Sequence, residues 1–149
     1  MTCGRFSVFL RLFYDVYLFH MTREQIKALL EADPMLRIAI LFGSLAAGNA
    51  RPDSDLDIAV AADCRLNSAD KLRLIDKLSL LVGRPVDLVD LRTAGEPLLG
   101  QILQKGDRLF VRDQRLFAEL IKRHLFDSAD FLPYRRRILA ERRQAWIGT

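Results

Sequence analysis

Apolar and polar residues are distributed along this chain in short segments that predict strands and helices in alternation. Residues 36–42, LRIAILF, are apolar almost throughout, which is typical of a buried strand. Residues 55–60, DLDIAV, alternate between polar and apolar positions and predict a half-buried strand. Shorter apolar runs at 85–91 and 108–111 predict two further strands. The pattern therefore indicates a small sheet.

Other segments show the three- and four-residue spacing of apolar positions that is typical of helices. The expected helices cover residues 22–32, 68–82, 95–106, 114–126 and 134–146. Asn67 or Ser68 is expected to cap the second of them, and Gly83 to end it. DSADFLP, residues 127–133, is expected to separate the last two, and His124 to lie on an exposed helix face. These elements predict an α/β or α+β fold, in which helices flank a small mixed sheet.

The chain has 149 residues, which suits one domain. Residues 1–20 differ in composition and are expected to be an N-terminal extension. The domain is then residues 21–149, including C-terminal helices at about 113–147. Arg11 and Asp15 interrupt the apolar runs of the extension, so neither a membrane span nor a signal peptide is expected there.

Composition and charge exclude few classes of protein function. The net charge of +4 and the isoelectric point near 9.4 favour a polyanionic partner such as a nucleotide, nucleic acid or an acidic protein face, but a solvated basic surface is equally compatible. Cys3 and Cys64 form no disulfide framework and have no zinc-site partners at useful spacing. Two free thiols are typical of a reducing cytosol, so we expect a cytoplasmic protein.

Two aspartates on the second expected strand indicate a cation site. Asp55 and Asp57 lie two positions apart, so their side chains share one face and repel each other unless a cation lies between them. Magnesium prefers such hard oxygen ligands together with substrate phosphates. Asp87 or Asp90 on the third strand offers a third carboxylate, and alternation allows only one of them into the site. Two ions held by such a trio would suit phosphoryl or nucleotidyl transfer.

A Gly-Ser pair, Gly43 and Ser44, follows the first buried strand and is a candidate phosphate site. Small residues at the start of a helical turn expose backbone N–H groups that bind phosphate. Gly43 permits close approach of a phosphate, and the hydroxyl of Ser44 adds a donor. The loop 45–54 would then return the chain so that phosphates and carboxylates face each other.

The combination of these residues resembles a known family. Gly43-Ser44, ten residues and then Asp55-x-Asp57 resembles the signature of the polymerase-β-like nucleotidyltransferases. The words LFGSLAAGNARPDSDLDIAV and RPVDLVDL resemble its minimal nucleotidyltransferase branch. That branch includes the MntA-type adenylyltransferase antitoxins, which partner HEPN-domain toxins. The resemblance covers about residues 22–111 well and the C-terminal helices more loosely.

The resemblance implies the polymerase-β-like nucleotidyltransferase fold and a role for each matching residue. Gly43 and Ser44 would hold the phosphates of ATP, and Asp55 and Asp57 would be magnesium ligands. Asp87 would be the third ligand and would also activate the attacking hydroxyl. Family members often carry arginine at the position of Ala47, and Arg51 is close enough in the loop to replace it.

The expected activity is magnesium-dependent transfer of AMP from ATP to a hydroxyl, implied by the resemblance to be a tyrosine of a cognate HEPN toxin. The chain would then be an antitoxin. One alternative is a binding module that neutralises its partner by occlusion. Another is a nucleotidyltransferase that acts on a small molecule or on RNA. The basic C-terminal helices are the expected place of partner contact, and the formation of a homo-oligomer is left open.

Overall fold

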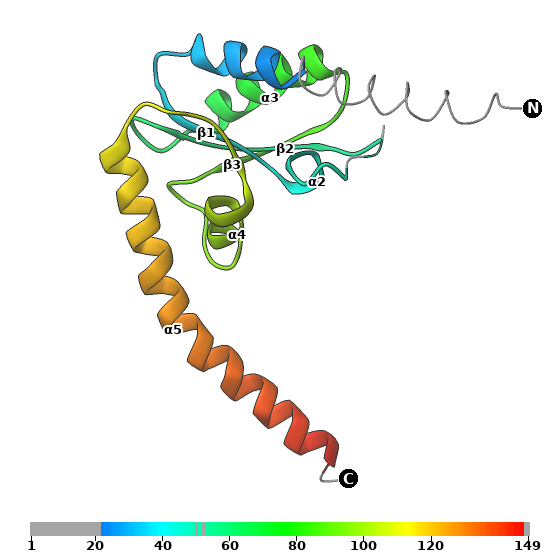
Figure 1. The fold of residues 1–149 in the computed structure, drawn as a ribbon, viewed down its shortest axis with the longest axis vertical. Helices are drawn as coiled ribbons and strands as arrows, with labels where there is room; N and C mark the ends of the chain where they lie inside the picture. The colour runs from blue at the N-terminus through cyan, green and yellow to red at the C-terminus, as the bar shows by residue number, and fades with distance from the viewer. Residues whose placement is uncertain (1–21, 50, 52, 148–149) are drawn as a thin grey trace, which may run out of the picture.

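The computed structural model describes residues 22–49, 51 and 53–147, so the expected N-terminal extension lies outside the described residues. Four strands form one mixed sheet in the order β3-β2-β1-β4. They are β1 (Leu36–Phe42), β2 (Leu56–Ala62), β3 (Val86–Asp90) and β4 (Asp107–Val111). Helices cover both faces of this sheet (Figure 1). The small mixed sheet flanked by helices, predicted from the sequence, is confirmed.

The pairing of the strands brings three chain segments together at one end of the sheet. β1 is antiparallel to both β2 and β4, whereas β2 and β3 are parallel. Phe42, the last residue of β1, lies opposite Asp57, and Asp57 lies opposite Asp87 of β3. The short helix α2 (Gly43–Ala46) follows β1 directly at this end. Both the Gly-Ser pair and the aspartates therefore belong to the same end of the sheet.

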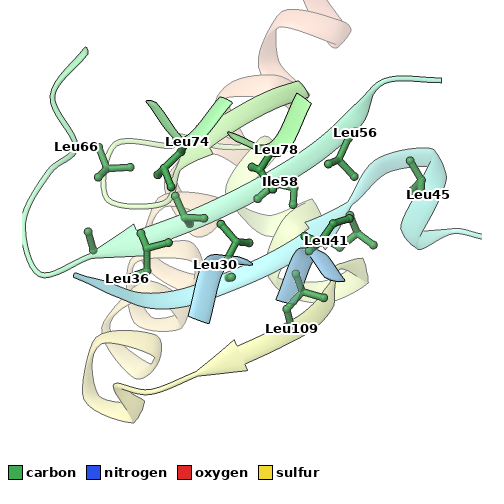
Figure 2. Packing of buried hydrophobic residues seen from close by; sticks show 14 residues of the cluster. Leu30, Leu36, Leu41, Leu45, Leu56, Ile58, Leu66, Leu74, Leu78 and Leu109 are labelled. Atoms are coloured by element: carbon green, nitrogen blue, oxygen red, sulfur yellow. The ribbon is translucent and has the colours of Figure 1, made fainter. Parts of the chain in front are cut away.

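One face of the sheet packs against α3 (Ser68–Val82) and the helix formed by residues 22–31. Their buried side chains, among them Leu30, Leu74 and Leu78, contact β-strand residues such as Leu41 and Ile58 (Figure 2). Burial of the apolar surface of this cluster stabilises the packing of the helices on the face. The cluster holds the even-numbered apolar positions of β2, as the alternation predicted.

The ends of α3 are set by the two residues expected from the sequence. The side-chain oxygen of Asn67 accepts a hydrogen bond of 2.8 Å from the backbone N–H of Asp70. Gly83 ends the helix with a φ of +66°, a left-handed conformation that glycine adopts without steric cost.

The other face of the sheet packs against α4 (Leu98–Lys105) and the first part of α5 (Gln114–Ile147). Ile40 and Ala59 of the sheet meet Ile102 of α4 and Leu120 of α5 in this second core. Arg123 of α5 also donates hydrogen bonds to the backbone carbonyls of residues 91, 92 and 94, after β3. The first third of α5 is thereby fixed to the domain.

The prediction of two C-terminal helices is wrong, because α5 continues through residues 127–133 with Pro133 inside it. A proline lacks the N–H for one helical hydrogen bond and costs roughly 3 kcal/mol in a helix interior. The same segment contains no glycine and no second proline, so a long helix is interrupted at one bond only. Figure 1 shows the later part of α5 extending away from the domain. No helix in the described part of the chain has the length and apolar character needed to cross a membrane.

Candidate functional site

Two of the three predicted carboxylates, Asp57 and Asp87, lie side by side on the face of the sheet that carries α4 and α5. Asp57 alternates with Ala59 along β2, and Asp87 alternates with Val89 along β3. Ala59 and Val89 both belong to the core beneath α4 and α5, so Asp57 and Asp87 point to that same side. The two aspartates are direct neighbours on parallel strands, whose backbones lie about 4.8 Å apart. Asp55 directly precedes β2 and is exposed.

The electrostatics of Asp57 show that it belongs to an acidic cluster. Burial raises the pKa of Asp57 above its ordinary value, and the negative charges of Asp87 and Asp55 raise it further. No hydrogen bond or ion pair to the side chain of any of these three aspartates occurs among the described residues. An unneutralised group of carboxylates raises the free energy of the folded protein, which an added cation would lower.

The donor chemistry of this cluster suits magnesium. Three carboxylates supply hard oxygen atoms, and the ion usually takes one or two of them together with phosphate oxygens. In residues 22–49, 51 and 53–147, no three acidic, histidine or cysteine side chains are already gathered closely enough to hold a metal ion. Asp55 and Asp87 are exposed.

Gly43 lies against the carboxylate of Asp57. The backbone of Gly43 has a φ of +71°, a left-handed conformation. A Cβ atom added there would come within 2.8 Å of the Asp57 carboxyl carbon and closer still to its Oδ2. Only a residue without a side chain therefore allows the end of β1 to pass this close to the aspartate. Both the positive φ of the turn and the position of the Asp57 carboxylate therefore require glycine at this position.

Ser44 lies in the first turn of α2 and is half-buried. Its backbone carbonyl accepts a hydrogen bond of 3.0 Å from the N–H of Asn49, which closes the loop back on the turn. α2 directly follows Phe42, which is paired with Asp57. The structure thus brings Gly43 and Ser44 to the same end of the sheet as the carboxylates.

Arg51 and Ser54 form a tight turn before Asp55. The backbone N–H of Arg51 donates to the hydroxyl of Ser54 at 2.8 Å, and the N–H of Ser54 donates to the carbonyl of Arg51 at 3.0 Å. Arg51 is exposed, and no contact of its guanidinium with the carboxylates is present among the described residues. The structure places Arg51 in the loop that leads to the acidic cluster, without fixing its side chain there.

Arg84 is a cation near the site that sequence reasoning missed. Its guanidinium donates a hydrogen bond of 3.3 Å to the backbone carbonyl of Ser54, next to Asp55. The carbonyl of Pro85 accepts the N–H of Leu56 at 2.9 Å, so the segments before β2 and β3 are joined at two points. No sequence signal distinguished Arg84 from other surface arginines. Its link to residue 54 depends on the parallel pairing of β2 and β3.

Asp90, the other candidate for the third carboxylate, lies on the opposite face from Asp57. Its side chain is 2% exposed and accepts hydrogen bonds from the backbone N–H groups of Leu66 at 3.0 Å and Arg92 at 2.9 Å. Asp90, the last residue of β3, therefore caps nearby backbone and does not enter the site. Asp87 alone adds a carboxylate to the cluster from β3.

His124 differs from its expected position on an exposed helix face. Its side chain is only 12% exposed and lies between α5 and α4, where Nδ1 is 2.7 Å from Oε1 of Glu96. Nε2 is 3.0 Å from the side-chain amide of Gln104. A Cβ atom at Gly100 would collide with the imidazole ring, so this glycine leaves room for the histidine. The prediction failed because Glu96, its partner, is distant in the sequence.

Comparison with known proteins was made against protein families and curated sequences. A family model described as polymerase beta, nucleotidyltransferase matches residues 24–115. Among curated proteins, the chain is similar to the protein adenylyltransferase MntA of Shewanella oneidensis. The two are 39% identical over 95 residues, which are 62% of this chain and 68% of the relative. The resemblance predicted from the Gly-Ser and Asp-x-Asp residues is confirmed.

Solved structures give the same result for the fold. A crystal structure of a toxin–antitoxin with AMP-PNP has a TM-score of 0.70 and 30% identity, and the match covers 80% of this chain and 96% of that one. A structure of a tri-AMPylated Shewanella oneidensis HEPN toxin in complex with MNT antitoxin has a TM-score of 0.66 and 27% identity. That match covers 83% of this chain and 97% of the other.

Proposed function

This chain belongs to the polymerase beta nucleotidyltransferase family, and on that premise we propose that it transfers AMP from ATP to a hydroxyl of a cognate HEPN toxin and so acts as an antitoxin. The observation that carries the proposal is the cluster of Asp55, Asp57 and Asp87 against the backbone of Gly43. The similarity to a protein adenylyltransferase and to toxin complexes supports the acceptor.

The acidic cluster is suited to bind magnesium together with the triphosphate. Asp55, Asp57 and Asp87 would hold magnesium, with two ions as the expected number, and the bound metal would supply positive charge to the phosphates during transfer. Asp57 is the central ligand because it lies between the other two and is the one half-buried. Burial and then the charges of Asp87 and Asp55 raise its pKa, and a bound cation would favour its ionised form.

The turn after β1 would hold the phosphates. The backbone N–H groups at Gly43 and the hydroxyl of Ser44 are donors near the carboxylates, and the left-handed glycine leaves the backbone uncovered. Arg51 lies in the exposed loop before Asp55 and would add positive charge to the leaving pyrophosphate. The triphosphate would then lie between these donors and the acidic cluster.

Asp87 is the residue we assign to activation of the acceptor. Its exposed carboxylate would accept the proton of the acceptor hydroxyl as the hydroxyl oxygen forms a bond to the α-phosphorus of ATP. The bond from that phosphorus to the bridging oxygen breaks, and pyrophosphate leaves with the electron pair. A tyrosine hydroxyl is the assigned acceptor, since its proton is more acidic than that of serine or threonine.

The test is transfer of label from ATP to purified toxin. Wild-type chain with magnesium should label the toxin, and Asp57→Asn and Asp87→Asn should each reduce the rate by at least about a hundredfold, as is typical when a general base or charge-stabilising group is lost. Binding of the toxin by both variants should be unchanged. Labelling by either variant at the wild-type rate would contradict the assignment of the site.

A further inference from the structure

The part of α5 beyond His124 extends free of the domain, and we call residues 125–147 the arm. The last buried side chains of α5 are those of Leu116, Phe117 and Leu120, with Arg123 and His124 half-buried. The arm is roughly 35 Å long at 1.5 Å per residue. Its large exposed apolar residues are Leu125, Phe126, Tyr134 and Leu139, each more than half exposed. A helix of this composition is marginal in water unless something packs against it.

The arm lies outside the residues that the family model matches. The family match ends at residue 115, just after α5 begins at Gln114. The buried part of α5 already completes the core beneath the sheet. The arm therefore contributes neither to the core nor to the acidic cluster, and its exposed apolar residues need another explanation.

One side of the arm continues the side of α5 that packs on the domain. Phe117, Leu120 and His124 face the domain at three- and four-residue spacing. Continued along the helix, the same spacing reaches a set that we call the arm face. The arm face consists of Tyr134, Arg135, Ile138, Leu139 and Arg142. Arg137 and Gln144 lie on the opposite side, as do Leu125 and Phe126.

The charge of the arm identifies the chemistry of what covers it. Residues 135–143 contain five arginines and one acidic residue, Glu141. Arg135 and Arg142 lie within the arm face, between its apolar side chains. A surface that combines apolar and arginine side chains in this way is typical of protein interfaces. An acidic protein surface with apolar residues of its own is complementary to it.

Two other occupants fit less well. In a pair of arms from two copies of this chain, arginines would face arginines in either orientation, because the basic residues lie on both sides of Leu139. Residues 1–20 carry Arg5 and Arg11 against a single acidic residue, Asp15, so this segment cannot neutralise the arm. RNA would match the charge but leave the exposed apolar residues uncovered.

The arm lies on the same side of the sheet as the acidic cluster. α4 and α5 cover the face to which Asp57 and Asp87 point, and α5 leaves the domain on that side (Figure 1). A protein bound along the arm face would therefore approach the domain from the side on which the carboxylates are exposed. Docking at a distance from the reacting atoms would position an acceptor hydroxyl, which lowers the entropic cost of the transfer step.

We propose that the arm face is the docking surface for an acidic, partly apolar surface of the toxin that receives AMP. The inference rests on the proposed function, because the occupant is the acceptor protein. It assigns recognition of the acceptor to residues of α5 that take no part in nucleotide binding. The acidic cluster is left with the chemistry alone.

The test compares matched variants on opposite sides of the arm, using the HEPN toxin of the same organism. Arg135→Glu reverses a charge on the arm face, and Arg137→Glu makes the same change on the opposite side. Leu139→Gln removes apolar surface without a charge change, and Ala140→Gln is its control. Each variant is measured for toxin affinity, for KM and kcat of AMP transfer, for ATP affinity and for helix content by circular dichroism.

The arm-face variants should weaken toxin binding by at least about tenfold, which corresponds to about 1.4 kcal/mol. The KM for toxin should rise by a similar factor, whereas ATP affinity and kcat at saturating toxin should match wild type. Arg137→Glu and Ala140→Gln should stay within about threefold of wild type. Retained toxin affinity in Arg135→Glu and Leu139→Gln, with helix content unchanged, would overturn the inference.

Two further outcomes separate this inference from the proposed function. If wild type transfers AMP to the toxin and all four variants do so with wild-type KM, the docking inference fails and the proposed function stands. If wild type neither binds nor modifies the toxin, both fail. Equal loss of toxin affinity in Arg135→Glu and Arg137→Glu, without loss in Leu139→Gln, would indicate general charge attraction along the arm and would also overturn the inference.

Discussion

At the scale of single residues, the site depends on the contact between Gly43 and Asp57. The glycine is required both for its positive φ and because an added side chain would occupy the place of the Asp57 carboxylate. Asp57 in turn is held half-buried beside Asp55 and Asp87, where burial and like charge raise its pKa. Without a cation, this arrangement of three carboxylates therefore raises the free energy of the folded state.

Substitution of Gly43 separates these two requirements when it is compared with Gly48. Both glycines have a φ of +71°, so Gly43→Ala and Gly48→Ala should each lose about 1–2 kcal/mol of unfolding free energy from backbone strain. Nothing lies within 4 Å of a Cβ at Gly48, whereas at Gly43 the Asp57 carboxylate must move. Denaturant unfolding and AMP transfer measure the two effects.

Only Gly43→Ala should abolish transfer, and its loss of stability should exceed that of Gly48→Ala. Equal transfer rates in the two variants, at a temperature where both are folded, would show that contact between Gly43 and Asp57 is not needed for the chemistry.

At the scale of elements, β3 carries two aspartates with separate roles. Asp87 is exposed beside Asp57, and Asp90 is buried on the other face as an acceptor for two backbone N–H groups. Alternation along one strand therefore divides a chemical from a structural carboxylate. The sequence PVDLVDL alone therefore did not show which of its two aspartates faces the site.

The separate roles of Asp87 and Asp90 predict opposite effects when each is replaced by asparagine. Asp90→Asn should lose about 1–3 kcal/mol of unfolding free energy, because an amide NH₂ replaces one carboxylate oxygen opposite a buried N–H group. Its transfer rate at low temperature should be near wild type. Asp87→Asn should be at least as stable as wild type and inactive. Urea titration measures the stability of each variant, and the labelling assay measures its transfer rate. Loss of transfer by a fully folded Asp90→Asn would contradict the separate roles of the two aspartates.

The pairing of β4 with the helix of residues 22–31 gives a prediction about pH. Arg23 donates from Nε and Nη2 to the two carboxylate oxygens of Asp107 at 2.6 and 3.0 Å. These hydrogen bonds hold the pKa of Asp107 below its ordinary value. A carboxylate with a lowered pKa stabilises the folded state above its unfolded pKa near 3.9, and this contribution is lost as the pH falls through the lower folded pKa.

Asp107→Asn should therefore cost about 1 kcal/mol or less at pH 7, since the pair is partly exposed, and progressively less as the pH falls through the lowered folded pKa. Unfolding of wild type and variant by urea at several pH values measures the difference. Asp76→Asn, at an exposed position of α3, is the control and should show no such dependence. A difference between variant and wild type that stays constant down to the lowest pH at which both still fold would contradict this account of Asp107.

The strands and the ends of α3 were predictable because their signals are local. A continuous apolar run, a period of two, an Asn cap and a terminal glycine each act within a few residues, and the structure has them as expected. The aspartates of β2 were placed on one face by the same local rule. The third carboxylate needed the parallel pairing of β2 and β3, which a single strand does not encode.

The remaining features depend on contacts between distant segments. His124 is buried by Glu96 and Gly100 of another helix region, and Arg84 reaches Ser54 across a strand pair. Pro133 was interpreted as a helix break although a long helix tolerates it.

At the scale of the whole molecule, the chain divides its tasks between a domain and an arm. The domain carries the proposed nucleotide site at one end of its sheet, and α5 continues past the domain (Figure 1). This later part of α5 contains the arginines and exposed apolar residues of the arm. Under the proposed function, the acceptor is bound in one place and modified in another. Catalysis and binding should then be separable by mutation, which would not hold for an antitoxin that acts by occlusion.

The measurement that tests this central claim most directly is the intact mass of the toxin purified with the chain from the same cells. With wild type, the toxin should carry one or more AMP groups, and cells should survive. With Asp57→Asn, which leaves the arm unchanged, the toxin should co-purify with the chain, remain unmodified and stay toxic once released. A toxin that carries no AMP and is still neutralised by both chains would contradict the claim that this protein acts by transferring AMP.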